Sequence, residues 1–201
     1  MATAAPDLSQ VEVLDPRGQP VRLGTTWEAF PGPSVLAWLR HFGCLYCLLP
    51  IRTLLAAAPA IQAQGAQLVL IGNGSPAQAS RFQQEVAADH RVFTDPALVS
   101  YRAIGAHRSL LGTARWRDLG IWRQGRAQGI RQRGKQGDAL QLGATLVVAP
   151  SGQVLLRHLN RSLGDDLPVP ALLARLRQAG LEWHPNRGGG GAPSEKVASR
   201  G

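Results

Sequence analysis

The sequence predicts an α/β domain with one mixed β-sheet and helices on both faces. Short apolar runs bounded by Gly, Pro or Ser, such as residues 34–40 and 67–72, are typical of buried strands, and segments with helical spacing of apolar residues separate them. This alternation requires parallel strands, whereas a hairpin turn at residues 150–152 adds antiparallel strands. With 201 residues, 44% of them hydrophobic, the chain is long enough to bury a core.

The N-terminal part is predicted to start with a β-hairpin. Its strands are residues 11–15 and 20–23, and the Pro-Arg-Gly-Gln segment between them is the turn. After the buried strand at 34–40, residues 51–58 carry apolar side chains at helical spacing. We therefore expect a helix there, with Pro50 inside it or near its start.

Helix and strand alternate through the middle of the chain. Ser75 is expected to cap a helix at 76–88 that has proline at its first position. A short strand at 91–94 follows, and Asp95 is expected to cap a helix that ends at Gly105. This order predicts a βαβαβα core.

The C-terminal part closes the sheet and adds one helix. Residues 144–159 are predicted to form a β-hairpin, and residues 169–176 carry a helical apolar face. The predicted organisation is one domain over residues 1–187, with a basic insertion at about 106–137 and a flexible tail over 188–201.

The net charge of +9 is concentrated in one segment. Residues 96–137 hold nine Lys and Arg against one acid, Asp118, which gives that segment +8. Its arginines could bind nucleic acid through phosphates, and Trp116 and Trp122 could stack on bases, but the arginines follow no recognised motif. A solvated insertion is therefore favoured over a nucleic-acid surface.

The sequence indicates neither a membrane partner nor a secretory signal. No stretch reaches the roughly 18 apolar residues of a membrane span. The first residues lack the basic and apolar regions of a signal peptide. We therefore expect a cytoplasmic protein, in which a C-x-x-C motif favours catalysis or metal binding over a structural disulfide.

The only two cysteines, Cys44 and Cys47, form such a C-x-x-C motif where a buried strand ends and a helix begins. Unpaired N–H groups and the helix dipole favour a thiolate there, and helical spacing places the second cysteine on the same face. This arrangement predicts a nucleophile, Cys44, and a resolving partner, Cys47. Two other interpretations stay open: a zinc site, for which His41 would supply only a third ligand, and two buried core cysteines.

Four segments of the chain, within roughly residues 33–178, resemble one protein family. This family is the peroxiredoxin-like group of the alkyl hydroperoxide reductase/thiol-specific antioxidant superfamily. The resemblance implies a thioredoxin-like fold. The four segments are LRHFGCLYC at 39–47, LVLIGNGSPAQASRFQQE at 68–85, VFTDPALVSYRAIG at 92–105, and the stretch from GDALQLGATLVV to LPVPALL at 137–173.

The resemblance also implies roles for individual residues. Cys44 matches the peroxidatic cysteine and Cys47 the resolving cysteine, while Thr145 matches a position that lies against the active cysteine in thioredoxin-like folds. Arg40 and His41 precede the motif, and either can stabilise a thiolate; Arg40 can equally extend from the strand end into solvent.

The function implied is that of a thiol-dependent oxidoreductase. It would reduce a hydroperoxide, endoperoxide or disulfide through the dithiol/disulfide couple, with thioredoxin or another dithiol as its reductant and with no metal or organic cofactor. The alternative is a binding module that docks nucleic acid or an acidic partner on the basic insertion and has lost redox activity.

The chain departs from the family pattern beside the motif. Typical peroxiredoxins have proline seven residues and Thr or Ser three residues before the nucleophile, and these positions hold Ala37 and His41. Leu48 and Leu49 replace an Arg-Glu pair usual after the second cysteine. The hydroxyl that binds peroxide is therefore missing. The rim of the expected active site next to Cys47 becomes apolar, which suits a lipid-like substrate or contact with a partner protein.

Overall fold

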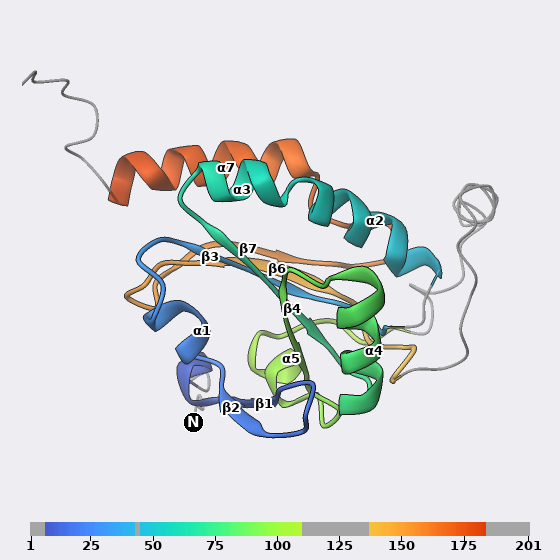
Figure 1. Ribbon diagram of the computed structural model, residues 1–201. Helices are drawn as coiled ribbons and strands as arrows, with labels where there is room; N and C mark the ends of the chain where they lie inside the picture. The colour runs from blue at the N-terminus through green and yellow to red at the C-terminus, as the bar shows by residue number, and fades with distance from the viewer. Residues whose placement is uncertain (1–6, 43–44, 110–136, 184–201) are drawn as a thin grey trace, which may run out of the picture.

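A computed structural model describes residues 7–42, 45–109 and 137–183 (Figure 1). One central sheet separates two helical layers, with α7, α3 and α2 along one side in Figure 1 and α1 and α5 on the other. The elements in chain order are η1 (Leu8–Gln10), β1 (Glu12–Leu14), β2 (Pro20–Arg22), α1 (Thr25–Glu28), β3 (Ser34–Trp38), α2 (Leu45–Ala56), α3 (Ala58–Ala63), β4 (Gln67–Gly72), α4 (Pro76–Val86), β5 (Arg91–Thr94), α5 (Val99–Ala103), β6 (Ala144–Val148), β7 (Val154–Leu159) and α7 (Val169–Trp183).

The sheet is mixed, as predicted. Its seven strands run in the order β2-β1-β5-β4-β3-β6-β7. The crossover-connected strands β3, β4 and β5 are parallel, whereas β1, β2, β6 and β7 pair antiparallel with their neighbours. Both predicted hairpins are present, and the carboxyl ends of β3 and β4 lie at the same edge of the sheet.

Side-chain alternation along β3 divides the core into two clusters. Val35 and Ala37 face the cluster that α2, α3, α4 and α7 cover, while Leu36 and Trp38 face the cluster beneath α1 and α5. All four side chains are buried, because β3 lies inside the sheet with helices on both faces.

The helix at 76–88 is confirmed, with a small difference at its end. Ser75 and Gln78 form a capping box, in which the Ser75 hydroxyl accepts the Gln78 N–H and the Gln78 side chain accepts the Ser75 N–H. Helix α4 ends at Val86, because Ala87 leaves helical backbone geometry.

Three helical predictions were incomplete. Helix α1 was not predicted, and the helix after the cysteines is divided at Ala57 into α2 and α3. Helix α5 does not start at Pro96, because Leu98 has a left-handed backbone conformation (φ 58°) and the helix follows it. Gly105 ends that helical segment as predicted, with φ 67°.

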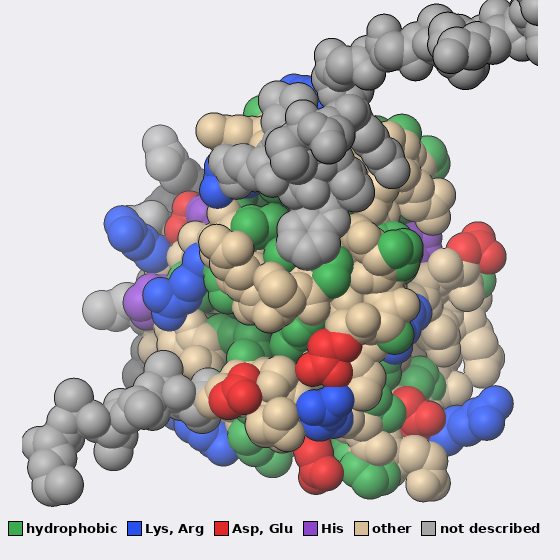
Figure 2. All heavy atoms as spheres, turned by 90° about the vertical axis from the view of Figure 1, so that its left-hand side faces the viewer, with side chains coloured by type: hydrophobic (Ala, Val, Ile, Leu, Met, Phe, Trp, Pro, Cys, Tyr) green, Lys and Arg blue, Asp and Glu red, His purple; other side chains and the backbone are tan. Residues whose placement is uncertain are grey.

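Two other expectations lie largely or wholly outside the described residues: most of the basic insertion and the tail at 188–201. Among the helices that the structure describes, none combines the length and the apolar character required to cross a membrane. Figure 2 shows the end of the molecule opposite the start of α2, where acidic and basic side chains are interspersed and do not gather by sign.

Candidate active site

The C-x-x-C motif lies at the junction between β3 and α2. Strand β3 ends at Trp38, and Cys47 is the third residue of α2, so the predicted strand-to-helix junction is confirmed. Cys44 lies outside the described residues, and of Cys47 the structure describes the backbone alone. Pairing of the two sulfurs therefore stays a prediction.

Pro50 lies inside α2, one turn beyond the cysteines. Proline has no N–H, so the carbonyl of Tyr46 receives no helical hydrogen bond from position 50. The ring of Pro50 also lines both of the hollows that adjoin α2. The first turn of α2 is thus less constrained by backbone hydrogen bonds than a regular helix.

Arg40 connects the end of β3 to the loop before β6. Its Nε donates to the Ala139 carbonyl at 2.7 Å, and Nη2 donates to the same oxygen. Its guanidinium is therefore held against residues 137–142, and the predicted extension into solvent is wrong. Stabilisation of a thiolate by Arg40 stays a prediction.

The same loop has two further anchors. Asn73, at the end of β4, donates from Nδ2 to the Asp138 carbonyl at 3.2 Å. Gly137 is required beside it, because its φ is 113° and a Cβ there would lie 2.0 Å from the Asn73 Oδ1. The Asp138 carboxylate accepts the Leu140 N–H at 2.8 Å and the Arg108 Nε–H at 2.9 Å. Partial burial raises the pKa of Asp138, but these hydrogen bonds and the Arg108 charge together hold it below its usual value.

His41 and Phe42 are buried directly before the cysteines. His41 is 5% exposed, and the Phe42 ring packs on Phe82 with ring centroids 5.0 Å apart. Within the part of the chain that the structure describes, no three His, Cys, Asp or Glu side chains gather as metal ligands. Burial of the His41 and Phe42 side chains helps to fix the segment before Cys44. The zinc interpretation stays open, because the structure describes neither cysteine side chain.

A hydrogen-bonded network supports the β3 end from the other face. The Tyr101 hydroxyl, in α5, bonds to the carbonyls of Leu39 and Ile71 and so joins the ends of β3 and β4. Trp38 Nε1 donates to the Ser100 hydroxyl at 3.0 Å, and that hydroxyl donates to the buried Asp95 carboxylate at 2.7 Å. Sequence reasoning assigned Asp95 to helix capping and missed this network, because no local pattern links residues that are 62 positions apart.

Two adjoining hollows lie between α2 and the segment that leads from β7 to α7. The smaller, of about 50 Å³, reaches Arg40 and Gly143, and the larger, of about 210 Å³, reaches Leu54 and Leu172. They share Trp38, Leu39, Pro50, Ile51, Asn160 and Asp166 as lining residues, so they adjoin, and we call the two together the α2 cleft.

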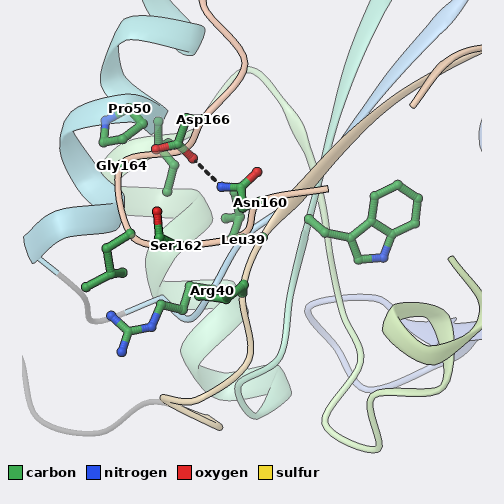
Figure 3. Close-up of a pocket in the computed structure, with 12 residues that line it drawn as sticks. Leu39, Arg40, Pro50, Asn160, Ser162, Gly164 and Asp166 are labelled. Carbon is green, nitrogen blue, oxygen red and sulfur yellow. Dashed lines mark hydrogen bonds between the residues drawn. The ribbon is translucent and has the colours of Figure 1, made fainter. Parts of the chain in front are cut away.

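Six polar residues line the α2 cleft, namely Arg40, Thr53, Thr145, Asn160, Ser162 and Asp166. In Figure 3 the side chains of Asn160 and Asp166 point toward each other near Pro50, and Asn160 Nδ2 donates to Asp166 Oδ1 at 2.8 Å. Thr145 lies within β6, opposite Ala37 of β3, and lines the larger hollow. Thr145 is therefore a strand residue, as expected from the hairpin predicted at 144–159, and it borders the cleft. Sequence reasoning did not identify Asn160 or Asp166, since neither belongs to a recognisable motif.

Comparison with known proteins identifies one family. The family model for AhpC/TSA antioxidant enzymes matches residues 53–162. The chain is 30% identical over 179 residues to the Thioredoxin-like protein AAED1, chloroplastic, of Arabidopsis thaliana, covering 84% of this chain and 71% of that protein. It is 30% identical over 165 residues to the Prostamide/prostaglandin F synthase of Homo sapiens, covering 78% and 80% of the two chains.

Solved structures support the fold. The peroxidoxin BcpB of Mycobacterium tuberculosis superposes with a TM-score of 0.62 at 18% identity and covers 89% of this chain and 98% of that chain. The same thioredoxin-like architecture is thus present at low sequence identity, and the predicted fold class is confirmed.

Proposed function

Because the chain belongs to the AhpC/TSA antioxidant enzyme family and is a thiol-dependent oxidoreductase, we propose that it reduces a hydroperoxide or endoperoxide through the Cys44–Cys47 couple. One observation of the fold carries the assignment to these cysteines. They are the only cysteines of the chain, and they come where β3 ends and α2 begins. A disulfide is a further substrate that the same couple can reduce.

The proposed chemistry needs two thiols and an external dithiol. The Cys44 thiolate attacks one peroxide oxygen, the O–O bond breaks, and the other oxygen leaves as an alcohol after it takes a proton. With a hydroperoxide, Cys44 is then a sulfenic acid, and with an endoperoxide it is a sulfenate ester. The Cys47 thiol attacks this sulfur, which forms the disulfide and releases water from the acid or an alcohol from the ester. Thioredoxin or another dithiol supplies the two electrons that restore both thiols.

The cysteine variants test this assignment. With cumene hydroperoxide as oxidant and dithiothreitol as reductant, Cys44→Ser should abolish peroxide consumption. Pre-reduced Cys47→Ser, freed of dithiothreitol before the oxidant is added, should consume one equivalent of peroxide and leave a sulfenic acid on Cys44 that a dimedone probe traps. Unchanged turnover in Cys44→Ser would overturn the proposal, and a sulfenic acid on Cys47 in place of Cys44 would reverse the two roles.

The α2 cleft supports an organic peroxide as the substrate. Most residues that line its larger hollow are apolar, and Leu48 and Leu49 replace the charged pair usual in the group. A human relative bears the name Prostamide/prostaglandin F synthase, which supports a lipid-like substrate. We therefore assign Thr145 to the cleft wall, and Arg40 to positioning residues 137–142 beside the motif.

Leu54 offers a test of the substrate class. It lines the larger hollow, whereas Leu173 packs on the same core cluster without lining it. Leu54→Asn should lower kcat/KM for cumene hydroperoxide about tenfold and leave that for hydrogen peroxide nearly unchanged, because an apolar contact with the substrate is lost. Leu173→Asn is the matched control and should affect both substrates alike. An equal loss on both peroxides in Leu54→Asn would contradict an apolar substrate site.

The alternative, a binding module that has lost redox activity, is not favoured by the family assignment. Most of the basic insertion on which that alternative depends lies outside the described residues. For the compartment we retain the cytoplasm as a proposal; the Arabidopsis thaliana relative is named chloroplastic.

A further inference from the structure

Strand β7 forms one edge of the sheet, and part of its outer backbone is available for pairing. Among the described strands, β6 alone pairs with it. The Asn160 N–H donates to the Gly143 carbonyl, so His158 and Leu156, two and four residues earlier, also direct their backbone groups at β6. The N–H and C=O groups of Arg157 and Leu159 therefore point away from the sheet.

One outward group of β7 is already occupied. The Leu155 carbonyl accepts the Arg175 Nε–H at 2.9 Å, so a side chain from α7 caps the start of the edge. Within the described part of the chain, no residue bonds to the outward backbone groups of Arg157 and Leu159. The open stretch is thus short and begins beyond the position that Arg175 covers.

The open stretch borders a polar hollow of about 420 Å³. Its lining carries two arginines and two histidines against one acid, which leaves a net positive charge even with both histidines neutral. We call this feature the β7 hollow. Its lining residues are His107, Arg157, His158, Leu159, Arg161 and Asp165.

The basic groups of the β7 hollow occupy both faces of the sheet. Arg157 lies opposite Leu146, on the α5 face, where its Nη2 donates to the Ile104 carbonyl at 2.6 Å. His158 lies opposite Thr145, on the α7 face, where its Nε2 lies 2.6 Å from the Asp165 carbonyl. Both side chains are held in place beside the edge before any partner binds, which reduces the entropy lost on binding.

The remaining groups leave the hollow as a whole with one net positive charge when both histidines are neutral, because Asp165 offsets one of the two arginines. His107 lines the same hollow, and its carbonyl accepts the Leu142 N–H at 2.9 Å. Arg161 joins His158, and its backbone N–H donates to the Asp165 carboxylate at 2.8 Å, so that carboxylate is partly satisfied by the backbone. The Arg161 side chain itself is exposed.

We propose that β7 docks an extended acidic segment of a partner protein as an additional strand of the sheet. Consecutive residues of a strand point to opposite faces, so of two adjacent carboxylates one would meet Arg157 on the α5 face and the other would lie on the side of the exposed Arg161. The outward backbone groups of Arg157 and Leu159 would supply the ladder hydrogen bonds. A second copy of this chain is a poorer occupant, because pairing β7 with itself would bring like charges together.

Peptide binding to the full-length chain tests the proposal by fluorescence anisotropy at low salt. The probe is a labelled, capped peptide TVTEEVTV, and its uncharged counterpart is TVTQQVTV. The glutamate peptide should bind at least about tenfold more tightly, and its affinity should fall with added salt. Two further peptides carry N-methyl groups at the odd or at the even positions. One of them should not bind and the other should bind nearly as well as the parent, because successive strand N–H groups point to opposite sides and only one set faces β7.

Two arginine variants locate the surface. Arg161→Gln should weaken peptide binding about three- to fivefold, as expected for the loss of one exposed charge pair. Arg17→Gln makes the same charge change at the hairpin turn beyond the opposite edge strand and should have no effect. Peroxide turnover, which depends on a different site, should be unchanged in both variants.

Several results would overturn the proposal. Equal effects of N-methylation at the odd and at the even positions would show that charge alone binds the peptide. Full competition by single-stranded DNA with no loss in Arg161→Gln would place binding elsewhere. A dimer in sedimentation that Arg161→Gln strengthens and the peptide does not disrupt would show that the edge pairs with a second copy instead.

Discussion

At the scale of single residues, Gly72 determines how the segment before the cysteines packs. It ends β4, and a Cβ at this position would lie 2.2 Å from the Phe42 Cζ. The Phe42 ring occupies that space, packs on Phe82 and is 4% exposed. Because Phe42 is two residues before Cys44, the missing side chain of Gly72 helps to position the start of the motif.

Gly72→Ala should therefore move the Phe42 ring and disturb the cysteine segment. We expect about 1–3 kcal/mol lower stability, the usual cost of overpacking, together with slower peroxide reduction. Urea unfolding and kcat/KM measure the two effects. Phe42→Leu in the same chain should recover part of both losses, and strictly additive effects of the two substitutions would contradict direct contact.

At the scale of elements, the sequence could predict what each segment encodes locally. The strands 34–38, 67–72 and 91–94 and the helix after Ser75 have their own hydrophobic period, turn residues or cap, and all are present. The start of α5 could not be predicted in this way. Asp95 and Pro96 resemble a helix start, but α5 begins only at Val99. The Asp95 carboxylate still accepts an N–H of the first turn, that of Ser100 at 2.6 Å, and also the Ser100 hydroxyl.

The hydrogen bonds of Ser100 connect α5 to the end of β3 and are expected to stabilise the fold. Ser100→Ala should lower the free energy of unfolding by about 1–3 kcal/mol, because the buried Trp38 Nε1 and Asp95 carboxylate both lose a partner. Urea unfolding with constant m-value checks this loss. Ser80→Ala, which removes an exposed hydroxyl from α4, is the control and should change stability by less than about 0.5 kcal/mol. Equal losses in the two variants would show that the network adds nothing.

At the scale of the whole molecule, the candidate site is assembled from three distant parts of the chain. The β3–α2 junction, residues 137–145 and the segment between β7 and α7 meet around the α2 cleft. The motif itself was visible in the sequence, because two cysteines at this spacing are a local signal. The hydrogen bonds from Arg40 to Ala139 and from Asn160 to Asp166 could not be predicted from the sequence, because they depend on how the fold places these segments.

The loop at 137–142 makes the stability of this assembly dependent on acid pH. Burial raises the pKa of Asp138. Hydrogen bonds from the Leu140 N–H and from Arg108 lower this pKa by more than burial raises it, so the net shift is downward. The folded state then binds the proton less readily than the unfolded state. Asp138 therefore stabilises the fold above the unfolded pKa, near 3.8, and this contribution is lost as the pH falls through the lower folded value.

Unfolding free energies measured from pH 7 down to pH 2 should show this contribution. Asp138→Asn should be less stable than the natural chain near neutrality, and the difference should shrink below about pH 4 as the natural carboxylate takes up its proton. Asp89→Asn, at an exposed position, should follow the natural chain throughout. A constant gap between Asp138→Asn and the natural chain across this range would show that the ionised form of Asp138 does not anchor the loop.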